Sequence, residues 1–408
     1  MIIKSPFVES LIQKIQYFTL NDENVNIIFT LLHIFSLLSR PKIPEFNDLI
    51  NEKFIKKLIF FCQHPQLIIN SLQCISNLIW ISDFSFGLFY KNELFSHLQI
   101  LLTCNNEEIL ILCALIDQRS LEFLDKIYRD YTRKKNAKHD NYEIDPIISN
   151  LSLIMQCPLE KPKMQAITSI PQIIQMKGNS LDAETVNFYL SLAIQIGQFN
   201  DTYHFATSIA IISEFIEDGN ETAYEIFKVN EQIITILKKG LNYASEPEIQ
   251  IFSIETVCIM IVNIAEAHAL MKKYQIVDDI FLIANEGGTT CKEKVVEAVC
   301  RIFYDDKSPL QEDVIQKGGF EFLCDAIYYS NECSQIVNVF LRITSKPAPF
   351  GPNCINRLTQ YGLIEILEES IRSLEYLESE DKKVKDYIDN ATYLKNFLLN
   401  PNPDDNSI

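Results

Sequence analysis

The sequence predicts an all-α protein, a right-handed α-α superhelix of about nine stacked helical repeats. Hydrophobic residues make up 47% of the 408 residues, with only 11 glycines and 15 prolines, a composition that favours a packed helical core. Apolar segments of one pattern recur every 40 to 44 residues. Within each segment, apolar residues recur three and four positions apart, which is the spacing of one helix face.

Each predicted repeat contains a helix that opens on an apolar anchor residue. Six segments contain such an anchor directly. Counting back 43 residues from anchors already found gives three more. The nine anchors are Leu11, Phe54, Leu94, Ile147, Leu190, Ile233, Ile276, Phe320 and Leu363. The residue four places after each anchor should share its buried face, and all nine are apolar: Ile15, Leu58, Leu98, Leu151, Ile194, Leu237, Ile280, Cys324 and Leu367.

A second, longer apolar helix follows each anchor helix after a short polar break, as in residues 253–267 and 292–306. Such a unit buries its apolar face only by stacking on its neighbours, so the repeats should share one continuous core. We therefore expect one solenoid over residues 1–400 and a disordered acidic tail over residues 401–408.

Charge and composition exclude several classes of protein. The net charge of -18 repels phosphate backbones, so we expect no general nucleic-acid binding and a preference for a protein partner with a basic segment. The eleven cysteines are scattered without a C-x-x-C pair, which indicates small core residues in a reducing compartment. We find no signal peptide and no apolar stretch of the roughly 20 residues that a membrane span requires. These features predict a cytoplasmic protein without a membrane segment, with the nucleus as the other compartment.

Catalytic and metal-binding patterns are missing from the sequence. It contains no G-x-S-x-G, P-loop, H-E-x-x-H or G-x-G-x-x-G motif. Cys62 and His64 form a C-x-H pair, but zinc would need a second pair at a suitable spacing. We therefore predict that the protein is not an enzyme and uses no cofactor, metal or small-molecule substrate.

Three stretches resemble a known family. Residues 64–102, 217–241 and 305–327 are similar to the armadillo repeats of importin alpha and beta-catenin, with their long third helix, small-residue turn and following helix. The period of about 43 residues lies in the armadillo and HEAT range. The resemblance covers most of the chain. It implies a scaffold or adaptor that holds an extended or helical segment of a partner protein along a concave groove of third helices.

The resemblance also implies groove residues. In importin-alpha-like proteins, one asparagine per repeat bonds the backbone of the bound peptide, and a tryptophan one turn earlier stacks on its basic side chains. No tryptophan occupies that slot here. The predicted groove residues are Gln73, Asn77, Asp117, Glu214, Asn263, Glu297, Arg301, Asn338 and Arg342. The acids at 117 and 214 and the arginines at 301 and 342 predict two zones of opposite charge, suited to a partner with one basic and one acidic end.

A basic insertion interrupts the repeats near residues 119–146, where the spacing between anchors grows to 53. Its cationic residues are Arg129, Arg133, Lys134, Lys135 and Lys138. One interpretation is an arm that contacts this protein's own groove or a partner. The other is a solvated loop or helix extension. The lone Trp80 is similarly either a binding anchor at the groove or part of the core between repeats.

Two functions besides a scaffold remain open at this point. A nuclear transport receptor of the importin-alpha type would bind a basic nuclear-localisation peptide. An armadillo-type nucleotide-exchange cofactor would accelerate nucleotide release from a heat-shock chaperone.

Overall fold

The computed structural model describes residues 6–40, 49–133, 142–243, 246–306, 308–346, 350–375 and 382–400. Over these residues the regular structure is helical, without a strand. The chain divides into two compact units, Met1–Gly178 and Asn179–Ile408, each of which is described by itself. The prediction of one uninterrupted array over residues 1–400 stays a prediction, and the predicted tail at 401–408 lies outside the described residues.

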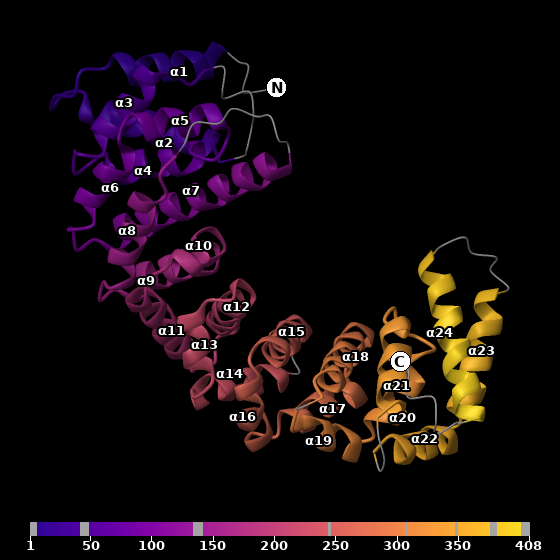
Figure 1. Cartoon of the computed structure of the whole chain (residues 1–408). Helices are drawn as coiled ribbons and strands as arrows, with labels where there is room; N and C mark the ends of the chain where they lie inside the picture. Colours follow the sequence, from indigo (N-terminus) through magenta and orange to yellow (C-terminus); the bar gives the residue numbers. More distant parts are fainter. Residues whose placement is uncertain are drawn as a thin grey trace. The chain divides into compact units, whose positions relative to one another are not determined.

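Unit 1 contains two rows of helices (Figure 1). Its helices are α1 (Pro6–Tyr17), α2 (Val25–Leu38), α3 (Glu52–Phe61), α4 (Ile68–Leu78), α5 (Asp83–Lys91), α6 (Leu94–Leu101), α7 (Glu107–Arg133), α8 (Asp145–Met155), α9 (Glu160–Ile167) and α10 (Ile170–Lys177). One row runs α2, α4, α7 and α9, each packed on the next, and we call these the third helices. The second helices α1, α3, α6 and α8 carry the anchors, and α1 packs on α3 and α6 on α8.

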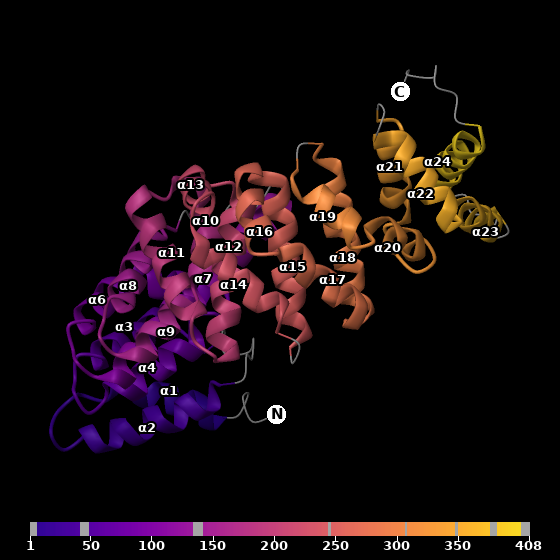
Figure 2. The same cartoon turned by 90° about the horizontal axis from the view of Figure 1, so that it is seen from below.

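Unit 2 continues the same pattern. Its helices are α11 (Ala183–Gly197), α12 (Thr202–Asp218), α13 (Glu221–Phe227), α14 (Glu231–Leu241), α15 (Pro247–Asn263), α16 (His268–Lys273), α17 (Ile276–Glu286), α18 (Thr289–Tyr304), α19 (Leu310–Gln316), α20 (Gly319–Ala326), α21 (Cys333–Thr344), α22 (Phe350–Tyr361), α23 (Leu363–Glu375) and α24 (Lys382–Leu399). Short 3-10 helices lie at Gly178–Ser180 and Ala265–Ala267. The third helices α12, α15, α18, α21 and α24 pack in that order. The first helices α13, α16 and α19 line one edge, and the second helices α14 and α17 line the other (Figure 2).

The predicted anchors are confirmed. Each of the nine lies on the second helix of a repeat and is at most 3% exposed, so the described residues form nine repeats. Eight of the nine residues four places later are also buried. The exception is Ile194, which is half-buried because α11 turns Tyr189, Ala193 and Ile196 to the core instead.

Local sequence signals start many of these helices. The side chains of Asn51, Asp182, Asp201, Asn220 and Asn230 each accept a hydrogen bond from a backbone N–H in the first helical turn. These bonds satisfy donors that the helix itself leaves unpaired. Short polar residues between apolar runs therefore mark where a helix begins.

The basic insertion begins as a helix extension. α7 is 27 residues long and runs through Arg129 to Arg133. Lys134, Lys135 and Lys138 lie outside the described residues, as do the side chains of Arg129 and Arg133. The two interpretations of the insertion therefore both stay open beyond residue 133.

The cysteines behave as core residues. All eleven are free, and eight of them are buried. Among the described residues, no single helix has the length and apolarity of a membrane span. Two consecutive segments, Pro247–Asn263 and Ala265–Lys273, together have the length and apolar composition of a membrane span. The chain bends by 116° between them.

Candidate functional site

The third helix α15 exposes an apolar stripe. α12, α14 and α18 pack against it, and its Ser253 faces Gly240 of α14. The side turned away from α14 carries Phe252, Ile259 and Val262, whose spacings of seven and three residues place them on one helix face. Phe252 is 57% exposed and Val262 is 58% exposed. Large apolar side chains in such an exposed row are typical of a contact surface.

Polar residues continue this surface on the neighbouring third helices. α12, α15, α18 and α21 lie side by side in unit 2 (Figure 1). Six of the predicted groove residues lie on their exposed side: Glu214 on α12, Asn263 on α15, Glu297 and Arg301 on α18, and Asn338 and Arg342 on α21. We call these six residues, with Phe252, Ile259 and Val262, the third-helix surface of unit 2.

Ion pairs within α18, and one from α18 to α15, neutralise most of the charge at the centre of this surface. Lys294 Nζ lies 2.7 Å from Glu255 Oε1 and 3.3 Å from Glu297 Oε2, and Arg301 Nη2 lies 2.5 Å from Glu297 Oε1. Burial raises the pKa of Glu297, but hydrogen bonding from Arg301 and the charge of Lys294 outweigh it and hold this pKa below its ordinary value. Glu255 and Glu297 are therefore paired carboxylates on this surface.

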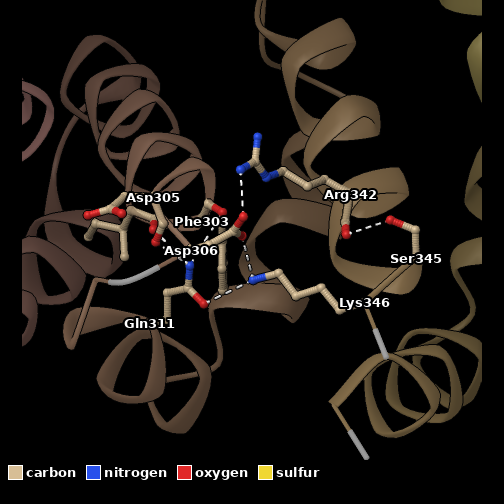
Figure 3. A network of polar contacts seen from close by, with 8 residues as sticks. Phe303, Asp305, Asp306, Gln311, Arg342, Ser345 and Lys346 are labelled. Atoms are coloured by element: carbon tan, nitrogen blue, oxygen red, sulfur yellow. Dashed lines mark hydrogen bonds and ion pairs between the residues drawn. The ribbon is translucent and has the colours of Figure 1, made fainter. Parts of the chain in front are cut away.

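Arg342 belongs to a second network, which joins two repeats (Figure 3). Asp306 accepts from Arg342 Nη2 at 2.7 Å and from Lys346 Nζ at 2.9 Å. The hydrogen bond from Arg342, with that from Lys346, lowers the pKa of Asp306 to about 2. Gln311 Nε2 donates to Asp305 O at 2.7 Å, and Gln311 Oε1 accepts from Lys346. These bonds link the end of α18 to α19 and α21.

The predicted zone of positive charge at residues 301 and 342 is therefore wrong. Arg301 is paired with Glu297, and Arg342 is paired with Asp306. Glu297 and Arg301 are four residues apart, a helical spacing that the sequence displays, but the partner of Arg342 lies 36 residues away along the chain and leaves no local pattern.

In unit 1, the predicted groove residues Gln73 and Asn77 lie half-buried on α4. Asn77 Nδ2 donates to Ser36 O at 2.9 Å and to Ser39 Oγ at 3.3 Å. These bonds satisfy backbone and side-chain groups at the end of α2. Asn77 thus joins two successive third helices.

The prediction that Asp117 lines the groove is wrong. Asp117 is 0% exposed and lies on the buried side of α7. Burial raises its pKa well above the ordinary value, and the nearby Asn150 amide counteracts this only in part. Neither carboxyl oxygen has a hydrogen-bond partner. A buried acid in this state cannot contribute charge to a partner surface.

The residue of α7 that corresponds to Asn77 is Arg119. Its Nη1 donates to Ser76 O at 2.5 Å and to Ser76 Oγ at 2.8 Å, as Asn77 does to Ser36 in the preceding repeat. Its guanidinium carbon lies 4.4 Å from the centre of the half-buried Trp80 ring, a cation-π distance. Trp80 therefore lies where the third helices of two repeats meet.

Arg119 and Asn77 both lie 25 residues after the start of the second helix of their repeat. The same offset counted from the start of α6 therefore reaches Arg119, two positions after the predicted Asp117.

We expect Asn77→Ala to lower the free energy of unfolding by about 1 kcal/mol, because it removes bonds that join α4 to α2. Gln73→Ala, at a half-buried position one turn earlier on the same helix, is the matched control and should cost less. Urea denaturation followed by circular dichroism measures both. Equal midpoints for the two variants would contradict the joining role.

Metal coordination is not indicated by the side chains that the structure places. Among the described residues, no group of three His, Cys, Asp or Glu side chains could hold an ion. Cys62 is buried, and His64 Nδ1 accepts from the backbone N–H of Gln66 at 3.3 Å, as expected of a turn residue.

Comparisons with known proteins identify the fold. No protein-family profile and no curated protein matches the sequence. In structure, the chain is similar to an engineered protein with a TM-score of 0.62 and 12% identity, over 96% of this chain and 99% of that one. It is also similar to beta-catenin, in a study of a phosphorylation switch that controls its interaction with cadherin. The TM-score there is 0.63, with 11% identity over 94% of this chain and 67% of that one. A designed armadillo repeat protein gives a TM-score of 0.47 at 15% identity, over 62% of this chain and 99% of that one. The first two likenesses show that the chain has the armadillo-type α-α solenoid fold that the sequence predicted.

Proposed function

We propose that this protein is a non-enzymatic scaffold or adaptor, and that the third-helix surface of unit 2 binds a segment of a partner protein. The exposed apolar stripe of α15 carries this proposal. Phe252 and Val262 are each more than half exposed, although the chain is rich enough in apolar residues to fill a core. Burying such side chains against a partner gains about 25 cal/mol for each Å² of apolar surface.

Polar groups around the stripe suggest the chemistry of the partner. Asn263 and Asn338 are exposed. Asn263 Nδ2 donates to Ile216 O at 3.4 Å, and Asn338 Oδ1 accepts from Asn390 Nδ2 at 3.2 Å. Because a carboxamide has two N–H groups and an oxygen with two lone pairs, each side chain keeps further bonding capacity for a peptide backbone. Glu214 and Glu217 place two carboxylates on α12, beside the stripe. A partner segment with apolar side chains and a basic group therefore fits this surface best, which agrees with the negative charge of the whole chain.

The test compares two valines that receive the same substitution. Val262→Glu places a carboxylate in the apolar stripe, whereas Val229→Glu places one at a residue that is 75% exposed between α13 and α14. We expect affinity purification with mass spectrometry to recover the same partners with wild type and Val229→Glu, and to lose them with Val262→Glu. Recovery of every partner by the Val262→Glu protein, with an unchanged melting temperature, would reject the proposal.

A further inference from the structure

The third helix of the first repeat, α2, carries an apolar face that the proposed function does not use. Ile27, Leu31, Ile34 and Leu38 are spaced by four, three and four residues, which places them on one side of the helix. Ile27 is 47% exposed, and the other three are half-buried. We call these four residues the α2 stripe.

The α2 stripe points away from the next repeat. The opposite side of α2 contacts α4, where Asn77 Nδ2 donates to Ser36 O at 2.9 Å and Cys74 Sγ donates to Leu32 O at 3.4 Å. Ser36 and Leu32 lie about half a turn around the helix from the stripe. In a solenoid, the side of a third helix opposite its neighbour is where one more helix stacks.

Charged residues flank the α2 stripe but do not enter it. From Asn24 to Ser39 the chain has no Asp, Glu, Lys or Arg, although its net charge is -18. Asp22 and Glu23 precede this run and Arg40 follows it, and all three are exposed. α2 therefore has an acidic start, an uncharged middle and a basic end.

The third helix of the last repeat, α24, differs from α2 in this respect. It packs on α21 and α23, and its exposed sides are charged. The exposed charged residues are Lys382, Lys383, Lys385, Asp386 and Asp389. A polar outer face of this kind is what keeps the terminal repeat of a solenoid soluble. The α2 stripe lacks such a face, so it gains by stacking on another apolar surface.

We propose that two copies of this chain associate through their α2 helices, packed antiparallel about a twofold axis. The α2 stripe is its own complement in this arrangement, because the spacing of four, three and four reads the same in both directions. Ile27 then meets Leu38 of the partner subunit, and Leu31 meets Ile34 of the partner subunit. Apolar residues at this spacing form the seam of paired helices, and a twofold interface requires such self-complementarity.

Charge selects a second copy in this orientation. With the stripes aligned, Arg40 lies level with Val25 of the partner subunit, about 3 Å along the axis from Glu23 of the partner subunit. Each end of the helix pair thus brings one arginine close to Asp22 and Glu23. A parallel pair would instead place like charges together. Stacking of α2 on α24 would cover charged side chains with apolar ones, which is costly.

Sedimentation equilibrium of the full chain measures the Kd of this dimer. Ile27→Glu places a carboxylate in both stripes and should raise the Kd about tenfold or more. Phe29→Glu is the matched control, because Phe29 is 46% exposed on the same helix but lies on a different side. It should leave the Kd unchanged, and the melting temperature of each variant checks the fold.

An exchange of charges tests the orientation. Arg40→Glu should weaken the dimer, since it would face Asp22 and Glu23 of the partner subunit with a further carboxylate. Adding Asp22→Lys and Glu23→Lys to the same chain should restore the dimer, because opposite charges would again meet at both ends. A triple variant as weak as Arg40→Glu alone would contradict the antiparallel arrangement.

A chain that stays monomeric up to its solubility limit would overturn the proposal. Equal effects of Ile27→Glu and Phe29→Glu would also overturn it and assign the dimer to another surface. A chain that is monomeric alone, and that loses a different protein partner only on Ile27→Glu, would assign the stripe to that partner instead. Val262→Glu should not change the dimer Kd, so the proposed function and this interface fail independently.

Discussion

Replacing Asp117 with asparagine is expected to raise the melting temperature of the protein at neutral pH. The carboxyl group is fully buried, and neither oxygen has a hydrogen-bond partner. Burial raises its pKa, and each unit of such a rise costs about 1.4 kcal/mol of stability once the pH is above the folded-state pKa. Asparagine has nearly the same shape and carries no charge, so it avoids this cost. In a domain of 150 to 250 residues, a gain of 1 kcal/mol raises the melting temperature by about 2–4 °C.

The raised pKa of Asp117 determines how the difference in stability between the two proteins depends on pH. Because the folded-state pKa of Asp117 is raised, its neutral form stabilises the fold below the unfolded pKa of about 3.9. That contribution is lost as the pH rises from there toward the folded-state pKa. Asp117→Asn and wild type should therefore melt at similar temperatures near pH 4 and diverge above it.

Thermal melts by circular dichroism between pH 4 and pH 8 measure this difference. Asp386→Asn is the matched control, since Asp386 is an exposed residue on α24. A difference that does not change with pH, or a less stable asparagine variant at neutral pH, would show that Asp117 has a partner that the fold requires.

Gly240→Ala should destabilise the protein, although alanine is normally the better helix former. Gly240 lies inside α14, where the exchange would otherwise gain about 0.8–1 kcal/mol. A Cβ atom there would meet Ser253 Oγ at 2.1 Å and Ile209 Cδ1 at 2.8 Å. Overpacking of this kind costs about 1–3 kcal/mol. We expect the steric cost to exceed the gain in helix propensity, because Ser253 and Ile209 are buried on other helices and have little room to move.

Denaturant midpoints of three variants test this packing. Gly288→Ala is the control, because a Cβ atom there meets nothing within 4 Å. It should change the midpoint little, whereas Gly240→Ala should lower it. Adding Ser253→Ala to Gly240→Ala removes the closest atom and should recover part of the loss. A Gly240→Ala protein as stable as wild type would mean that α14 and α15 can move apart at no cost.

The fold could be predicted largely from the sequence, and the candidate site only in part. Helix periodicity is displayed directly by a sequence. It was enough to predict the repeat period, the nine anchors, and most of the buried residues that follow the anchors by four positions. Asp117 was misplaced because a periodic pattern shows which residues share a face and not which neighbouring helix covers that face.

The amino-acid sequence by itself determined the stacking of helical units, because a unit with one apolar face has to bury it against the next unit. Only the tertiary structure decided which charges remain available to a partner. Arg342 is held by Asp306, and Asn77 is held by the end of α2. It also decided that Phe252 and Val262 stay exposed. The physical reason is distance along the chain, because contacts between residues about 40 positions apart depend on how repeats pack and leave no local pattern.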